Sequence, residues 1–90
     1  NAKYLVLKIL FELRNIELLK IHLKAFKTYI KRKANIGYHK TYFTNVCNAL
    51  YQLTDIYKNP VKHINYVFGN ETPDIEWFNK SLQELHSSKK

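Results

Sequence analysis

The stretch LLKIHLKAFKTYIKRK, residues 18–33, decides the fold because its lysines and its apolar residues fall on different sides of one helix. At about 100° per residue, four of the lysines lie within a wedge of roughly 60°. We call this row the lysine stripe: Lys20, Lys24, Lys27 and Lys31. The opposite side of the helix is apolar. The pattern therefore predicts a core helix whose lysines remain in water.

Two apolar rows cover that opposite side and together span about half of the helix circumference. The first row consists of Ile16, Leu19, Leu23, Phe26 and Ile30, and the second of Leu18, His22, Ala25 and Tyr29. A helix with this much apolar surface is expected to have neighbours on two sides. We therefore expect His22 to be partly buried near Tyr29.

Capping residues and helical periodicity extend the prediction to five helices. They cover residues 4–13, 16–33, 38–57, 61–68 and a fifth segment that begins after Pro73. Asn15 is the expected N-cap of the second helix, and Asn59 and Thr72, each followed by proline, are expected to begin the last two. Short connections predict antiparallel neighbours. The expected fold is all-α, built from antiparallel helix pairs.

Composition supports one small helical domain. The chain has 90 residues, 46% of them hydrophobic, with only two glycines and two prolines. The absence of methionine leads us to expect a fragment of a longer chain, with residues 1–2 a tag remnant, residues 3–86 a single all-α domain and residues 87–90 a polar tail. The single cysteine, Cys47, cannot form an intramolecular disulfide, so we expect a reducing, cytoplasmic location.

The segment FELRNIELLKIHLKAF, residues 11–26, resembles the middle of a tetratricopeptide-type repeat. More widely, residues 4–57 resemble the C-terminal region of uncharacterised bacterial tetratricopeptide-like helical-repeat proteins. The matching residues are Phe11, Leu13, Leu18, Leu19, Leu23, Phe26, Tyr29, Ile30, Arg32, Tyr42 and Phe43. The resemblance implies the end of an α-helical solenoid and no catalytic residues. Arg14 departs from the pattern because such a turn prefers glycine.

Residues suited to catalysis or metal binding are few. The four histidines lack ligand spacing, and no glycine-rich phosphate loop or paired carboxylates occur. Cys47 is expected to be a packed thiol rather than a nucleophile. We expect neither an enzyme nor a bound cofactor or metal.

The expected function is a protein-interaction scaffold at the capping end of a helical-repeat array. The capping core would comprise Trp77, Phe78, Leu82 and Leu85. The first helix is apolar nearly all round, so the isolated chain is expected to form a homodimer through Leu5 and Leu10. The alternative is a nucleic-acid-binding domain that uses the lysine stripe, because the net charge is +8 and the pI about 9.7.

Overall fold

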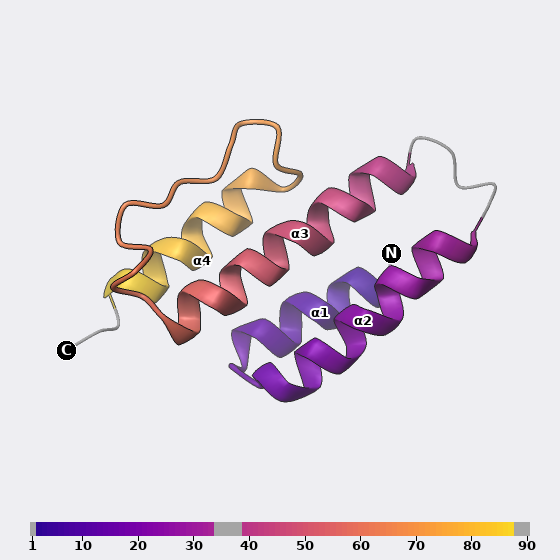
Figure 1. The fold of residues 1–90 in the computed structure, drawn as a ribbon, viewed down its shortest axis with the longest axis horizontal. Helices are drawn as coiled ribbons and strands as arrows, with labels where there is room; N and C mark the ends of the chain where they lie inside the picture. The colour runs from indigo at the N-terminus through magenta and orange to yellow at the C-terminus, as the bar shows by residue number, and fades with distance from the viewer. Residues whose placement is uncertain (1, 34–38, 88–90) are drawn as a thin grey trace. The chain divides into compact units, whose positions relative to one another are not determined.

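A computed structural model describes residues 2–33 and 39–87. All regular structure within these ranges is helical, and Figure 1 shows its four helices, α1 (Ala2–Glu12), α2 (Ile16–Arg32), α3 (His39–Lys58) and α4 (Ile75–Ser87). The chain divides into two compact units, residues 1–44 and 45–90. The boundary lies within α3, so the expected single domain of residues 3–86 contains two compact parts, which we treat separately.

In the first unit, a tight turn joins α1 and α2 into the predicted antiparallel hairpin. Arg14 adopts a left-handed conformation with φ of 59°. The backbone N–H of Arg14 donates to the Phe11 carbonyl at 2.9 Å, and that of Asn15 donates to the Leu10 carbonyl at 3.0 Å. These two bonds form a Schellman motif, which satisfies the carbonyls at the end of α1. The Asn15 side chain then accepts from the Leu18 N–H at 3.4 Å and caps α2, as predicted.

The hairpin buries one row of side chains from each helix. From α1 these are Tyr4, Leu7, Leu10 and Phe11, and from α2 they are Leu19, Leu23, Phe26 and Ile30. The α2 set makes up four of the five residues of the first apolar row, so their burial is confirmed, whereas Ile16, the fifth, is half-buried. Phe26 also meets the ring of Phe43 edge-on, with 5.6 Å between ring centroids.

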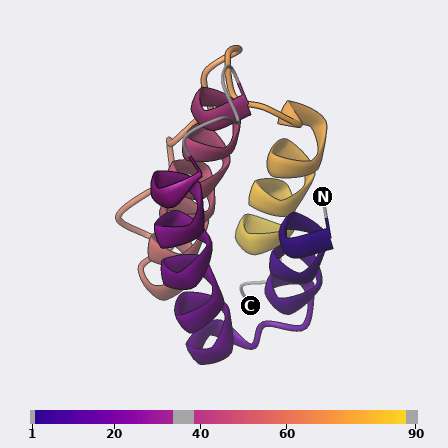
Figure 2. The same cartoon turned by 90° about the vertical axis from the view of Figure 1, so that its right-hand side faces the viewer.

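In the second unit, α4 runs in the same direction as the adjoining part of α3. Residues 59–74 return along α3 before α4 begins, and Figures 1 and 2 agree on this course. Antiparallel packing was predicted for consecutive helices, and the prediction placed a further helix between these two, so their common direction does not contradict it. A connection of this length can span the roughly 20 Å of helix that it passes, because an extended chain covers about 3.3 Å per residue. The unit buries Val46, Ala49, Leu50, Leu53, Ile56, Phe68, Phe78, Leu82 and Leu85.

The predicted fourth helix, residues 61–68, is wrong. The segment forms consecutive turns, in which His63 N–H donates to Pro60 and Tyr66 N–H donates to His63, three residues apart. Val61 and Val67 are 70% and 77% exposed, and among the apolar side chains of the segment only Phe68 is buried. A short helix is held mainly by a buried apolar stripe, and this segment has none.

The start of α4 also differs from the prediction. Thr72 N–H closes a turn onto the Gly69 carbonyl at 3.0 Å instead of leading into a helix. The helix begins after Asp74, whose carbonyl accepts from the N–H groups of Trp77 and Phe78. Asp74 has φ of 55°, a left-handed conformation that aspartate tolerates better than most residues. Pro73 therefore precedes the helix rather than occupying its first turn.

Candidate functional site

The lysine stripe lies on the surface of α2. All four of its side chains are exposed, and they occupy a different side of the helix from the buried row that contains Leu19 and Leu23. The solvated position that the helical wheel predicts for these lysines is confirmed. None of the four lysines lines any of the three hollows described below.

The second apolar row of α2 is not buried as expected. Leu18, His22 and Ala25 are exposed, and Tyr29 is half-buried. The prediction that His22 is partly buried is therefore wrong. Three residues of the row, His22, Ala25 and Tyr29, line a hollow of about 250 Å³ between α1 and α2, together with Lys3, Val6 and Phe26. The second side of α2 thus faces an open space within the hairpin unit.

The Tyr29 ring lies beside two hollows, and two lysine ammonium groups lie over it. The Lys3 Nζ lies 5.0 Å from its ring centroid and the Lys33 Nζ lies 5.6 Å from it. Phe26 stacks with the ring at 6.2 Å and an interplanar angle of 14°. The second hollow measures about 470 Å³ and is lined by Ala25, Thr28, Tyr29, Arg32 and Lys33. We call Lys3, Tyr29, Arg32 and Lys33, with the two hollows, the Tyr29 site.

Sequence reasoning missed the Tyr29 site because it sorted the residues of each helix separately. Lys3 lies in the first turn of α1, whereas Arg32 and Lys33 lie at the end of α2. The antiparallel hairpin brings these two helix ends together. The predicted hairpin was a sufficient signal to find this pairing.

One side of α1 exposes apolar residues to solvent. Leu5, Val6, Ile9 and Leu13 are 57%, 42%, 46% and 71% exposed. Leu5, Ile9 and Leu13 are four residues apart and follow one line along the helix and into the turn after it, and Val6, three residues before Ile9, lies beside this line. We call these four residues the apolar face. Leu10, which was expected to take part in self-association with Leu5, is only 8% exposed. It belongs to the hairpin core.

The residues expected to form a capping core lie together in α4 with different degrees of burial. Phe78, Leu82 and Leu85 are buried, whereas Trp77 is half-buried. Aromatic rings extend this cluster into the connection, since Phe68 lies 5.2 Å from Phe78 and Trp77 lies 5.1 Å from Phe78 between ring centroids. The cluster anchors the turns before α4 to the helix itself.

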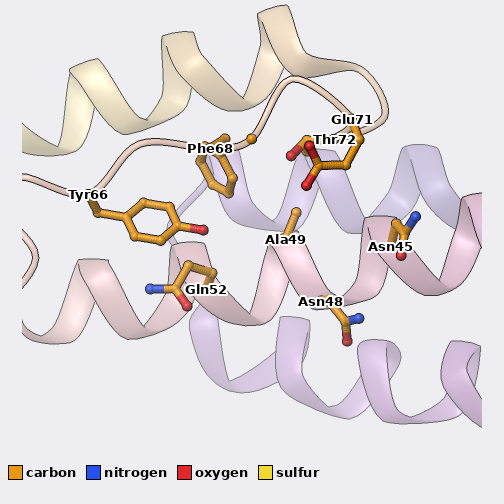
Figure 3. Close-up of a pocket in the computed structure, with 9 residues that line it drawn as sticks. Asn45, Asn48, Ala49, Gln52, Tyr66, Phe68, Glu71 and Thr72 are labelled. Atoms are coloured by element: carbon orange, nitrogen blue, oxygen red, sulfur yellow. The ribbon is translucent and has the colours of Figure 1, made fainter.

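A polar pocket of about 290 Å³ lies between α3 and the connection in the second unit (Figure 3). Its lining is Asn45, Asn48, Ala49, Gln52, Tyr66, Phe68, Gly69, Glu71 and Thr72. A Cβ at Gly69 would lie 2.6 Å from the carboxylate oxygens of Glu71, so the absence of a side chain there lets Glu71 fold over the backbone. Figure 3 shows the Asn48 amide pointing away from the connection. The pocket is open and has no charged partner for Glu71 among its lining residues.

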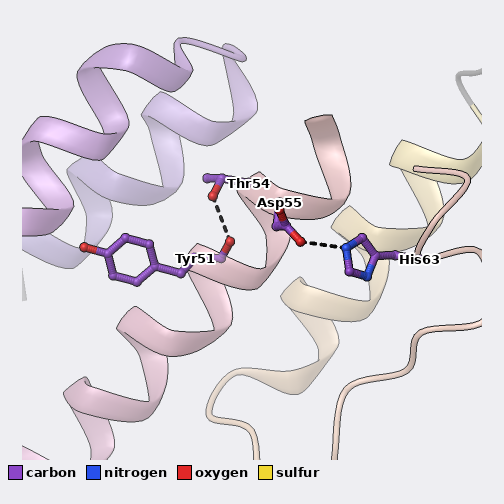
Figure 4. Close-up of polar contacts among 4 residues, drawn as sticks. All are labelled: Tyr51, Thr54, Asp55 and His63. Carbon is purple, nitrogen blue, oxygen red and sulfur yellow. Dashed lines mark hydrogen bonds and ion pairs between the residues drawn. The ribbon is translucent and has the colours of Figure 1, made fainter. Parts of the chain in front are cut away.

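Two polar contacts fix the C-terminal half of α3 (Figure 4). The Thr54 hydroxyl, which is buried, donates to the Tyr51 carbonyl at 2.8 Å. His63 Nε2 lies 2.6 Å from Asp55 Oδ2 and ties the turns after Pro60 to the helix. Asp55 is 49% exposed, so an ion pair at this position contributes at most about 1 kcal/mol.

The described residues contain no group of three or more histidine, cysteine, aspartate or glutamate side chains that could hold a metal ion. Cys47 is fully buried, which confirms that it is a packed thiol. None of the helices in residues 2–33 and 39–87 is long and apolar enough to cross a membrane. Comparison with known proteins finds no matching family model, no matching curated protein and no matching solved structure.

Proposed function

We propose that the chain is a non-catalytic protein-interaction domain whose apolar face packs against another helix. The observation that carries the proposal is the exposure of Leu5, Val6, Ile9 and Leu13 on one side of α1. Contiguous apolar surface of this kind marks interaction sites in soluble proteins. Anchors at these spacings are also those by which one helix lies against another.

The energy available from the apolar face is modest. Complete burial of a leucine, isoleucine or valine contributes about 1.5–3 kcal/mol, and roughly half of each of these side chains is still exposed. The four together would contribute on the order of 3–6 kcal/mol in each copy, and about 6–12 kcal/mol where two such faces meet. Association costs about 4–15 kcal/mol, so the contact would be weak and would depend on protein concentration.

The occupant we propose is a second copy of the chain, paired through α1 about a two-fold axis. Self-complementary apolar patches most often close in this way. Leu5 and Ile9 are central to the contact, whereas Leu10 is not, because its side chain is already buried. The resemblance to tetratricopeptide-like repeats supports a wider role at the capping end of a helical array, in which α1 would meet the helix of a neighbouring unit.

Sedimentation velocity between about 10 µM and 1 mM protein tests this function. We expect the parent chain to shift from monomer to dimer across the series, and Leu5→Lys and Ile9→Lys to remain monomeric. Val67→Lys is the matched control, because Val67 is 77% exposed but lies in the second unit. It should associate as the parent does. A parent chain that remains monomeric at 1 mM would contradict the proposal.

A further inference from the structure

The net positive charge of the protein is confined to one of its two units. Residues 1–44 hold ten of the fifteen lysines and arginines but only two of the seven acidic residues. Residues 45–90 hold five of each, so their formal charge is zero. The whole formal charge of +8 therefore belongs to the unit that contains the α1–α2 hairpin. Such asymmetry is typical of proteins that bind an anionic polymer.

Within the hairpin, the two acidic residues lie far from the Tyr29 site. Glu12 and Glu17 flank the turn, at the opposite end of the hairpin from Lys3 and Arg32. Along the helix axes they are separated from these cations by about 13 Å and 22 Å, at 1.5 Å per residue. Both distances exceed the Debye length of about 8–10 Å at ordinary salt. The positive potential at the Tyr29 site is therefore not neutralised by these carboxylates.

The two hollows of the Tyr29 site combine a flat aromatic wall with cations. Lys3 lines the first hollow, Arg32 and Lys33 line the second, and Tyr29 lines both. Among the described residues that line them, none is acidic. Aromatic rings that stack on bases and cations that pair with phosphates are the two elements of single-strand recognition. At present the two lysines cover the ring that a base would use.

We propose that the Tyr29 site binds single-stranded nucleic acid, with a base stacked on Tyr29 and the displaced lysine paired with the adjacent phosphate. A duplex does not suit the site, because its base faces are hidden within its own stack. An acidic peptide would pair with Lys3, Arg32 and Lys33 but would offer no flat partner for the ring. The site is distinct from the lysine stripe, which has no aromatic side chain within it.

Fluorescence anisotropy with labelled twelve-nucleotide oligo(U) and oligo(dT) at 50 and 150 mM salt tests the proposal. Tyr29→Ala should weaken binding about five- to a hundred-fold, as loss of one stacked base does. Tyr29→Phe keeps the ring and should bind within about two-fold of the parent. The pair Lys3→Gln/Lys33→Gln should lower the salt slope of log affinity by about 1.4, at roughly 0.7 per phosphate contact.

The matched control removes the same charge from the lysine stripe with Lys24→Gln/Lys27→Gln. We expect this double variant to retain most of the affinity of the parent. Adding Tyr29→Ala to it should weaken binding by the same factor as in the parent. Circular dichroism on every variant establishes that the helices are intact, and Tyr29→Phe keeps the test valid if the alanine variant fails to fold. Comparison of oligo(U) with oligo(dT) shows whether the site prefers single-stranded RNA or single-stranded DNA.

Several results would overturn the proposal. The first is the absence of binding by the parent at 50 mM salt. The second is a folded Tyr29→Ala variant that binds as tightly as the parent. The third is a Lys24→Gln/Lys27→Gln variant that loses as much affinity as Lys3→Gln/Lys33→Gln. Competition by polyglutamate as strong as that by oligo(U) would assign the site to an acidic protein instead. Binding at the Tyr29 site does not depend on the proposed dimer. Leu5 lines neither hollow, so Leu5→Lys, which should prevent the dimer, should bind the oligomers as the parent does.

Discussion

Phe78 is the largest fully buried side chain among the described residues of the second unit. It is fully buried and meets two aromatic rings, Phe68 at 5.2 Å and Trp77 at 5.1 Å between centroids. Truncation to alanine removes its buried area and leaves a cavity, which together cost about 3–5 kcal/mol. A chain of this length has a total stability of about 5–13 kcal/mol. Phe78→Ala should therefore remove a large part of it.

Urea denaturation measured by tryptophan fluorescence reports on this substitution directly. Trp77 is the sole tryptophan of the sequence, and it lies against Phe78. With an m-value of about 1–1.5 kcal/mol per molar urea, we expect the midpoint of the transition to fall by about 2–5 M. Far-UV circular dichroism follows the loss of helix in the same samples.

The control for this substitution is Val67→Ala, which removes an apolar side chain that is 77% exposed in the same connection as Phe68. It should change the free energy of unfolding by no more than about 0.5 kcal/mol. A Phe78→Ala variant whose free energy of unfolding stays within about 1 kcal/mol of the parent would refute the reasoning. The aromatic cluster would then not be what holds α4 to its unit.

Two further predictions concern the hairpin and use the same denaturation assay. Replacement of the whole lysine stripe by glutamine should leave the free energy of unfolding within about 1 kcal/mol of the parent, and a larger loss would mean that the stripe is not merely solvated. Arg14→Ala should destabilise the protein by about 1–2 kcal/mol, because it removes the Nη1 bond to the Phe11 carbonyl at 2.8 Å and the guanidinium 4.6 Å from the Phe11 ring centroid. Arg14→Gly should lose less, since glycine adopts φ of 59° without strain; an Arg14→Gly variant less stable than Arg14→Ala would contradict this.

The α1–α2 hairpin was predictable because its determinants are local. Asn15 caps one helix three residues after another ends, and apolar residues repeat at helical spacing on both sides of it. Even the departure at Arg14 has a local explanation, since its side chain contacts Phe11, three residues earlier. Short-range patterns of this kind determine where helices begin and end.

The connection between α3 and α4 was not predictable from the same rules. The Asn59–Pro60 pair and the apolar residues after it match the start of a helix in sequence. Whether they form one depends on a surface to cover Val61 and Val67, and the structure leaves both exposed. Phe68 is buried through its contact with Phe78, a residue ten positions later. The pattern holds no information about such a contact.

The Tyr29 site was partly predictable from the sequence, less so than the hairpin and more so than the connection between α3 and α4. It contains residues from both ends of the hairpin, so no single helical wheel displays it. An antiparallel hairpin, however, pairs residues whose numbers add to a constant, and here Lys3 with Tyr29 and Val6 with Phe26 both add to about 32. The predicted turn at Asn15 already implied that Lys3 would lie near Tyr29, Arg32 and Lys33. The lysine stripe can be found on the helical wheel of α2 alone. The Tyr29 site, which has hollows and an aromatic ring, can be found only when α1 and α2 are considered together.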